Sequence, residues 1–489
     1  MKDATLPPDP ALPPEAALGA GSPRLRTGIV LTVLLACQLM IILDGTVMNV
    51  ALSRIRSDLH FSATGLSWVG NAYTLVFGGL LLLGGRAGDF LGRRRVFLAG
   101  VGVFTAASLL GALAPTAGWL IAARVLQGVG AAMAGPNALA LLTSIFTEPK
   151  ARMRALALYS GMAGAGFAIG LIVGGVLTQW LGWRSVLFIN VPLGGLAVVL
   201  AARFLPAVPR HPARLDLPGA LTATAGVAAL VYGFHSAASD GWANATTCLS
   251  LLAGAGLVGV LIAVERKAPQ PLLPLLLFAD RNRAAAYANV FVGYMASIPM
   301  LFFLSLYMQD VRGASPLETG VAFLPAAVLM FVLIQWVPRL LKRVGPKPVT
   351  LTGSACLVAA LLLLTRLTED TGYFPTVFLA AVLMGCGTGL ALMPLSVIVM
   401  SEAPPSVAGA AGGTLQTIQQ TGTALGLSVL ATVFGVASRD ATGSPRQLLV
   451  TGVTAAFAAA AVMAALTFVG SLAFRRVARG ERPVRPSDS

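Results

Sequence analysis

The sequence has few charged residues, few cysteines and few histidines, and each shortage argues against a class of protein. Charged residues make up 11% of the 489 residues, whereas a soluble domain carries about 25%. The four cysteines lie far apart within apolar segments: Cys37, Cys248, Cys356 and Cys386. This spacing argues against disulfides and metal ligands. The three histidines form no HxxxH pair, and no GxxxxGK[ST] nucleotide-binding run occurs. We therefore expect no enzyme, no metal and no bound cofactor.

Long apolar runs are abundant. Hydrophobic residues make up 56% of the chain, the mean hydropathy is +0.81, and a membrane-spanning helix needs about 20 mostly apolar residues. The sequence predicts an all-α integral membrane protein with 14 transmembrane helices. The predicted spans are 27–51, 67–85, 95–115, 118–145, 153–180, 184–205, 216–237, 245–264, 284–308, 318–338, 348–366, 373–399, 406–435 and 449–474.

The basic residues indicate how the chain is oriented. The net charge is +15, but the basic residues lie between apolar runs rather than on one face, which argues against nucleic-acid binding. One set of loops and tails holds 26 Lys and Arg residues, and the opposite loops hold seven. Cytoplasmic loops carry this excess, so both termini are predicted to be cytoplasmic, in the inner or plasma membrane. Residues 1–26 are predicted to be a disordered tail, and residues 475–489 a basic tail.

A spaced pattern of glycines and basic residues occurs twice. The two copies are Arg86-x5-Gly92-x-Arg94-x5-Gly100 and Arg339-x5-Gly345-x-Lys347-x5-Gly353. Each copy joins a second helix to a third, which predicts six-helix bundles at 27–205 and 284–474. Residues 206–283 would then be a linker that carries two inserted helices. Repeated halves suggest two bundles that rock about a site near the membrane midplane; coincidence is the alternative, because Gly and Arg are common in short loops.

Two opposite charges lie within predicted spans. Asp44 is late in the first span and Arg124 is early in the fourth, and burying an acid there costs about 2.5–3.5 kcal/mol on insertion scales. Their offsets from the predicted span ends put both about 10 Å below the outer surface, so we predict that they face a shared interior cavity. Burial disfavours a charged carboxyl group and a guanidinium favours it, so a conformational change could load or release a proton at Asp44. The alternative is a fixed ion pair that anchors the helices.

The loop after the second predicted span is a candidate conformational gate. Its candidate residues are Gly85, Asp89, Gly92, Arg93 and Arg94. The glycines would allow a tight turn, and Asp89 would cap helix-end amides or pair with a basic residue across the two halves. The alternative for the arginines is that they only anchor the topology.

The fifth predicted helix carries a row of glycines. The candidate residues are Gly166, Gly170, Gly174 and Gly175, and such a face lets another backbone approach closely. It would be either a sliding seam between the two halves or ordinary helix packing. Candidate polar residues of a substrate cavity are Gln38, Asn71, Asn137, Asn289, Tyr294 and Gln416.

Four stretches in order along the chain resemble signatures of the major facilitator superfamily and of its fourteen-helix drug:proton antiporter group. The superfamily stretches are Gly85-x3-Asp89-x2-Gly92-Arg93-Arg94 and Arg124-x2-Gln127-Gly128-x-Gly130. The group stretches are Leu43-Asp44-x-Thr46-Val47-x-Asn49-Val50-Ala51-Leu52 and Leu181-Gly182-Trp183-Arg184-Ser185-Val186-Leu187-Phe188-Ile189-Asn190-Val191-Pro192. The likeness covers nearly all of residues 27–474. One departure is Leu171, which follows Gly170 where such exporters usually carry proline.

The resemblance implies a multidrug or antibiotic exporter that works by alternating access. It implies export of hydrophobic, often cationic, compounds in exchange for protons, and it supports coupling roles for Asp44 and Arg124. The expected partners are protons, the transported small molecule and membrane lipid, with a monomeric chain and no nucleic acid. Two other readings stay open: an importer or facilitator of a small solute on the same fold, and a membrane scaffold or sensor without transport.

Overall fold

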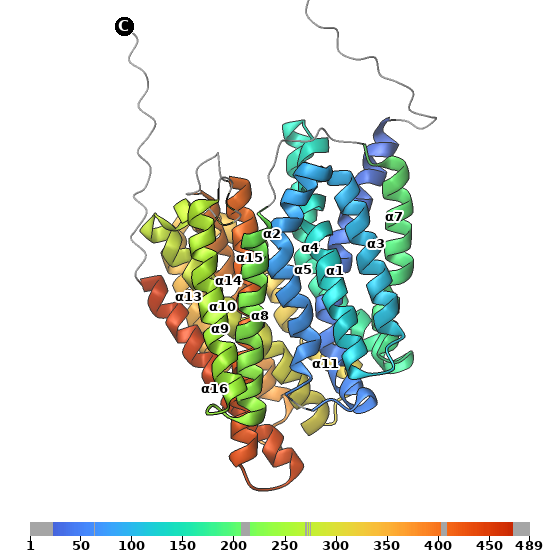
Figure 1. The fold of residues 1–489 in the computed structure, drawn as a ribbon. Coiled ribbons are helices and arrows are strands. Elements are labelled where there is room, and N and C mark those ends of the chain that lie inside the picture. The colour runs from blue at the N-terminus through green and yellow to red at the C-terminus, as the bar shows by residue number, and fades with distance from the viewer. Residues whose placement is uncertain are drawn as a thin grey trace, which may run out of the picture.

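The computed structural model describes residues 23–62, 64–206, 216–268, 271, 273, 275–401 and 408–472. Every regular element in these ranges is helical, and 14 of the helical segments are long and apolar enough to cross a membrane. The all-helical membrane fold and the number of spans predicted from the sequence are therefore confirmed (Figure 1). The predicted tails, 1–26 and 475–489, lie outside the described residues except at 23–26, where the first helix begins.

The helices follow the predicted order. The first half contains α1 (Pro23–Leu59), α2 (Ser67–Leu91), α3 (Arg93–Ala112), α4 (Ala117–Ile145), α5 (Pro149–Trp180), α6 (Arg184–Phe188) and α7 (Asn190–Phe204). The inserted pair is α8 (Leu217–Asp240) and α9 (Ala245–Lys267), followed by the short η1 (Leu275–Phe278). The second half contains α10 (Arg281–Leu306), η2 (Tyr307–Val311), α11 (Pro316–Ala322), α12 (Leu324–Val344), α13 (Pro346–Leu364), η3 (Tyr373–Val377), α14 (Phe378–Ser401), α15 (Ala408–Asp440) and α16 (Pro445–Leu472). The largest boundary error is at the first span, because α1 runs to Leu59 instead of ending at residue 51.

Polar residues in short loops determine where several helices begin. Thr116 accepts a hydrogen bond from a backbone N–H in the first turn of α4, and Asp280 does the same for α10. Ser315 and Glu318 bond reciprocally at the start of α11. These side chains satisfy N–H groups that have no partner within their helix, so these helices start at defined residues.

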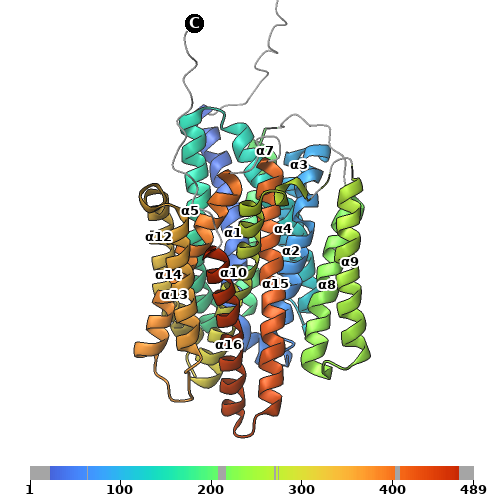
Figure 2. The ribbon, with the colours of Figure 1, turned by 90° about the vertical axis from the view of Figure 1, so that its left-hand side faces the viewer.

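The two halves lie side by side. The inserted helices lie at one edge of the interface between the halves. Figure 1 shows α1–α5 and α7 on one side and α10 and α13–α16 on the other, with α11 reaching beneath the first half. Figure 2 shows α8 and α9 beside α2 and α15. Thr432 of α15 donates a hydrogen bond of 2.6 Å to the carbonyl of Phe234 in α8. Earlier in α8, Thr224 packs closely on Gly79 of α2. The inserted pair therefore touches both halves through α8.

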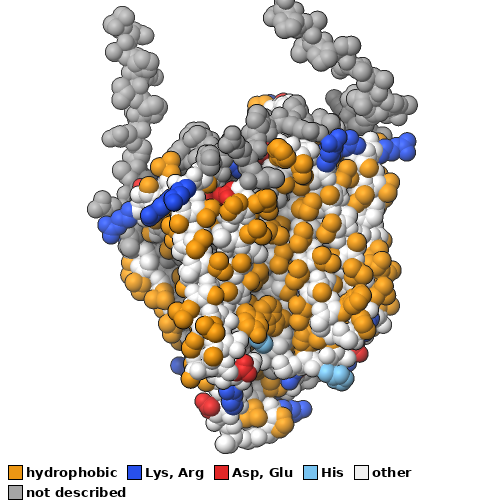
Figure 3. Space-filling model, viewed as in Figure 1, with side chains coloured by type: hydrophobic (Ala, Val, Ile, Leu, Met, Phe, Trp, Pro, Cys, Tyr) orange, Lys and Arg blue, Asp and Glu red, His pale blue; other side chains and the backbone are white. Residues whose placement is uncertain are grey.

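The outer surface of the bundle is suited to lipid. Apolar side chains cover the flank of the bundle, and Lys and Arg gather towards its ends (Figure 3). Large apolar side chains such as Leu249, Leu252 and Val199 are more than half exposed, which would be costly in water over so wide an area. The chain is therefore a multi-pass membrane protein.

The repeated glycine pattern occupies the same place in both halves. Gly92 links α2 to α3 with a φ of 103°, and Gly345 links α12 to α13 with a φ of 82°. Both values lie in the region that favours glycine. Arg94 and Lys347 each donate a hydrogen bond to a backbone carbonyl near the end of the sixth span of their own half, α7 and α16. The two motif copies thus make matching turns and matching contacts.

Candidate functional site

The structure brings Asp44 of α1 and Arg124 of α4 together inside the first half. An Nη1 atom of Arg124 lies 2.5 Å from Oδ2 of Asp44, and each residue is 1% exposed. The Arg124 guanidinium also lies 4.4 Å from the centre of the Tyr73 ring, within the range of a cation–π contact. The two charges therefore neutralise each other in an enclosed place, away from both lipid and solvent.

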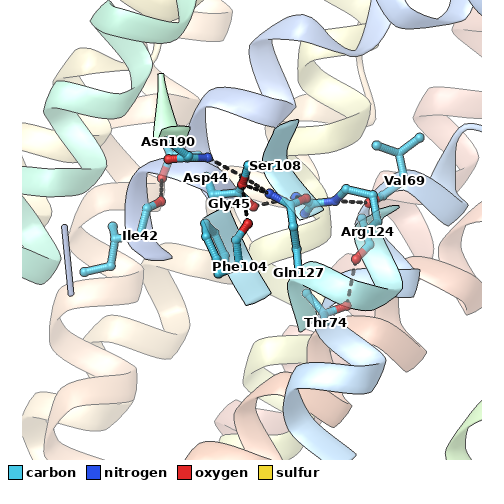
Figure 4. A network of polar contacts seen from close by, with 12 residues as sticks. Ile42, Asp44, Gly45, Val69, Thr74, Phe104, Ser108, Arg124, Gln127 and Asn190 are labelled. Carbon is cyan, nitrogen blue, oxygen red and sulfur yellow. Dashed lines mark hydrogen bonds and ion pairs between the residues drawn. The ribbon is translucent and has the colours of Figure 1, made fainter. Parts of the chain in front are cut away.

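Amide side chains complete the surroundings of the carboxylate (Figure 4). Oδ1 of Asp44 accepts hydrogen bonds from Gln127 at 2.9 Å and from Asn190 at 3.2 Å. Gln127 also accepts from Arg124 at 2.9 Å, and Arg124 donates to the Val69 carbonyl at 2.9 Å. A buried ion pair is stable only when such additional hydrogen bonds offset the loss of water. The carboxylate is thus held by three side chains that donate hydrogen bonds to it.

Two parts of the sequence-based interpretation of this pair need correction. The expected shared cavity is absent at the pair, because both side chains are enclosed in the described part of the protein. The predicted depth of Asp44 was counted from a helix end at residue 51, but α1 continues to Leu59. The equal depths of Asp44 and Arg124 therefore rested on the wrong helix end. Gln127 and Asn190 were not recognised as ligands of the carboxylate. The sequence could have indicated that Gln127 bonds to Asp44, because Gln127 follows Arg124 by three residues and residues three apart share a helix face.

The candidate gate residues do not form one loop. Only Gly92 lies at the turn, while Gly85 and Asp89 lie within α2, so the prediction that several glycines form the turn is wrong. Asp89 pairs with Arg93 at 3.0 Å within the same half. Among the described residues, its hydrogen bond and ion pair are both with Arg93, and none is formed with the second half. The helix continues through Gly85 because its backbone bonds are satisfied there and a single positive φ at Gly92 suffices to reverse the chain.

Arg93 and Arg94 fasten this turn to the rest of the first half. Arg93 donates to the Ser144 hydroxyl at 2.8 Å and to the Ala140 carbonyl at 3.3 Å, both in α4. Arg94 donates to the Ala202 carbonyl near the end of α7. The arginines thus hold α2, α3, α4 and α7 together at this end of the bundle, in addition to any effect on topology.

Most of the glycine row in α5 faces α1 rather than the second half. A Cβ atom on Gly170 would lie 2.8 Å from Thr46, and one on Gly174 would lie 2.9 Å from the Val47 backbone. Gly166 likewise packs on α1. The seam between the halves is therefore a wrong assignment for these three glycines, which permit ordinary close packing within the first half.

Two glycines, Gly175 of α5 and Gly320 of α11, permit close contact between the halves. A Cβ on Gly175 would lie 2.7 Å from the Leu317 backbone in α11, so this member of the predicted seam does face the second half. A Cβ on Gly320 of α11 would lie well inside van der Waals contact with the carbonyl oxygen of Leu171 in α5. Leu171, the residue that stands where related exporters usually have proline, is fully buried. The α5–α11 contact therefore depends on glycine in both helices.

Polar contacts join the halves at the end of the bundle opposite the start of α1, which we call the distal end. Arg56 of α1 forms an ion pair of 2.7 Å with Asp310 of η2. Ser305 donates to the Asn49 carbonyl at 2.8 Å, and Gln309 donates to the Val50 carbonyl at 3.0 Å. We call these three interactions the distal contacts. Together with the α5–α11 contact, they hold the distal end closed in this structure.

A cavity of about 340 Å³ lies between α5 and the second half. Its lining comes from α5, α10, α12, α14 and α15: Gly164, Phe167, Tyr294, Ser297, Ile298, Leu301, Ala326, Met330, Ile334, Met384, Gly385, Thr388, Leu392, Ser396 and Gln419. Of the six polar residues predicted to line a cavity, only Tyr294 is among them. Neither Asp44 nor Arg124 lines it.

The other five predicted cavity residues lie elsewhere. Asn71 donates to Ser428 at 2.9 Å and so joins α2 to α15 across the halves, while Asn137 donates to the Gly84 carbonyl within the first half. The remaining three are placed as follows: Gln38 accepts from Tyr159, Asn289 packs against Gly470, and Gln416 is half-buried on α15. Most of these predicted cavity residues therefore hold helices together. Residue type alone does not tell whether a polar side chain in a span joins two helices or lines a cavity.

Relatives named for antibiotic resistance or export resemble the chain over most of its length. It is 42% identical over 432 residues to the puromycin resistance protein pur8 of Streptomyces alboniger, covering 86% of this chain and 84% of that protein. It is 40% identical over 421 residues to the cephamycin export protein CmcT of Amycolatopsis lactamdurans, covering 85% of this chain and 86% of that protein. The methylenomycin A resistance protein of Bacillus subtilis is 31% identical over 443 residues, covering 89% and 94%.

The fold also matches solved transporter structures. An auto-inhibited POT family peptide transporter superposes with a TM-score of 0.67 at 16% identity, covering 95% of this chain and 99% of that one. A D-xylose–proton symporter superposes with a TM-score of 0.61 at 14% identity, covering 90% and 97%. The model of the Major Facilitator Superfamily matches residues 34–427. With its 14 membrane-spanning helices and its repeated halves, the chain belongs to the Major Facilitator Superfamily.

Proposed function

We propose that this chain is a proton-coupled secondary transporter that exports hydrophobic drugs, antibiotics or other toxic metabolites. The relatives named for resistance to puromycin and for export of cephamycin support the export direction and the type of substrate. The excess of basic residues on one set of loops supports a cell-membrane protein with both termini in the cytoplasm, and we propose that it works as a monomer. On that orientation the distal end faces outward.

The enclosed Asp44 carboxylate is the observation that carries the proton-coupling proposal. An acid buried within a span is costly, and such residues are commonly parts of proton pathways. Here Asp44 is bonded to three side chains on two other helices: Arg124 and Gln127 from α4 and Asn190 from α7. Protonation removes its attraction to Arg124 and must rearrange these bonds. Proton binding and helix movement are thereby linked energetically.

The proposed cycle connects that network to the distal end. The distal contacts link α10 and η2 to α1, the helix that carries Asp44. An outward-open form must break the distal contacts and separate α5 from α11. Protonation of Asp44 from outside would favour release of the compound and return of the empty transporter.

We expect the Arg56–Asp310 ion pair to stabilise the outward-closed form. Arg56→Asp would place two carboxylates together and shift the protein towards the outward-open form. Since the side chains are 29% and 20% exposed and partly exposed pairs contribute about 0–1 kcal/mol, the shift should be several-fold. It is measured as the rate at which a membrane-impermeant maleimide labels a cysteine placed at Leu317, which packs in the α5–α11 contact.

The exchanged pair, Arg56→Asp with Asp310→Arg, should restore the slow labelling rate. Arg54→Asp makes the same charge change two residues away, on an exposed side chain, and should leave the rate unchanged. If the exchanged pair labels as fast as the single variant, the ion pair does not hold the distal end closed.

Transport in membrane vesicles tests the proposed function. A cell made sensitive to several antibiotics is compared with and without this chain, and the protective compounds are then followed in inside-out vesicles. Export predicts accumulation that requires an imposed pH gradient and stops when a protonophore removes it. Gradient-driven uptake in right-side-out vesicles would instead identify an importer, and a solute flux independent of the gradient would identify a facilitator. The absence of any solute-dependent proton flux would favour a scaffold or sensor.

A further inference from the structure

We infer that the cavity selects uncharged, largely apolar compounds that carry hydrogen-bond acceptors, and that Tyr294, Thr388 and Gln419 bind those acceptors. This inference rests on the proposed function and names the class of compound that the same transporter would accept. It departs from the expectation, taken from the family resemblance, that the compounds are often cationic.

The described residues of the cavity wall include no carboxylate and no basic side chain that could pair with a charged compound. Its 15 lining residues include neither Asp, Glu, Lys, Arg nor His. The buried charges of Asp44 and Arg124 pair with each other and do not line it. A charged compound that leaves water for such a place loses its hydration without gaining a counter-ion. An uncharged compound of the same shape does not bear that cost.

Most of the wall is apolar and can adapt to different shapes. Phe167 of α5 supplies an aromatic surface, and Leu301 and Ile334 supply branched aliphatic ones. Met330 and Met384 lie in α12 and α14, and methionine fills irregular gaps easily because it is unbranched and polarisable. The volume of about 340 Å³ falls within the usual range for sites that bind small molecules.

Three polar side chains of the wall remain available to a ligand. Tyr294, Thr388 and Gln419 line the cavity from α10, α14 and α15, and their side chains make no hydrogen bond to another described residue. Ser297 and Ser396 differ, because each donates to a carbonyl of its own helix. Each hydroxyl or amide can therefore donate a hydrogen bond to a carbonyl of the ligand. Since the three groups come from three helices, they could also orient the compound.

Two dyes with the same ring system separate the uncharged from the cationic class. Nile red is uncharged and carries a carbonyl acceptor, while Nile blue has nearly the same shape and is a cation. Purified full-length protein in lipid nanodiscs is titrated with each dye, and fluorescence polarisation is measured against empty nanodiscs. We expect saturable binding of Nile red that is at least about tenfold tighter than that of Nile blue.

Variants of the cavity test which residues are responsible. Tyr294→Phe and Thr388→Val each remove one hydroxyl and should weaken Nile red binding by about two- to tenfold, the usual effect of one hydrogen bond. Thr388→Asp places a carboxylate in the wall and should weaken Nile red binding while strengthening Nile blue binding. Tyr232→Phe makes the matched change on an exposed tyrosine of α8 and should leave both affinities unchanged.

The outcomes separate this inference from the proposed function. Nile blue binding as tight as that of Nile red, the absence of saturable Nile red binding, or binding that none of the cavity variants alters would each overturn the inference. Gradient-driven export of antibiotics is measured independently in vesicles. Export together with a preference for Nile blue would keep the proposed function and reject the uncharged class. A preference for Nile red without any export would keep the site and reject the function.

Discussion

Asp44→Asn is expected to reduce transport driven by a pH gradient to background while substrate exchange continues. Asparagine has nearly the shape of the carboxyl group and cannot release a proton, so the variant imitates a permanently protonated Asp44. Exchange of labelled for unlabelled compound across the membrane requires movement of the loaded transporter but no net proton transfer. Both rates are measured in the same proteoliposomes, with a compound identified in the growth comparison.

The exchange rate also shows whether the variant is folded, which matters because removing one partner of a buried ion pair costs about 3–5 kcal/mol. Asp240→Asn is the matched control, since Asp240 is exposed at the end of α8, outside the network. It should keep both rates. Full gradient-driven transport by Asp44→Asn would exclude Asp44 as the coupling residue and leave the Asp44–Arg124 pair with only an anchoring role.

Gly320→Ala is expected to open the distal end by preventing the contact between α5 and α11. The added methyl group would overlap the Leu171 carbonyl oxygen, and backbone atoms cannot move aside as a flexible side chain can. Overpacking of this kind costs about 1–3 kcal/mol, which corresponds to about a 5- to 150-fold shift between two conformations. Maleimide labelling of the cysteine at Leu317 should accelerate within that range, and active transport should fall because the outward-closed form is depleted.

Gly259→Ala tests whether adding a methyl group to a membrane helix is itself harmful. Gly259 lies on α9, and a Cβ there would meet no atom within 4 Å. This control should label and transport as the unaltered protein does. If Gly320→Ala behaves in the same way, then α11 adjusts without separating from α5, and the glycine is not what permits closure.

The sequence by itself determined the membrane fold and the two residues at the centre of the site. The length of each apolar run follows from the thickness of the membrane, so the number of spans could be read directly. Asp44 and Arg124 were identifiable because any charge within a span is conspicuous against an apolar background. The matching turns at Gly92 and Gly345 were likewise visible as a repeated motif.

Only the tertiary structure decided which helix faces meet. In lipid both sides of a helix are apolar, so the pattern along α5 did not tell whether Gly170 faces α1 or the second half. The partners of Asp44 also come from different helices, and the amide of Asn190 differs from that of Asn71 only in what lies opposite it. The distal ion pair of Arg56 with Asp310 joins residues far apart in the chain. The described lining of the cavity comes from five helices, and their packing decides which side chains meet there. Hydrophobicity places a helix in the membrane but does not determine which helices it packs against.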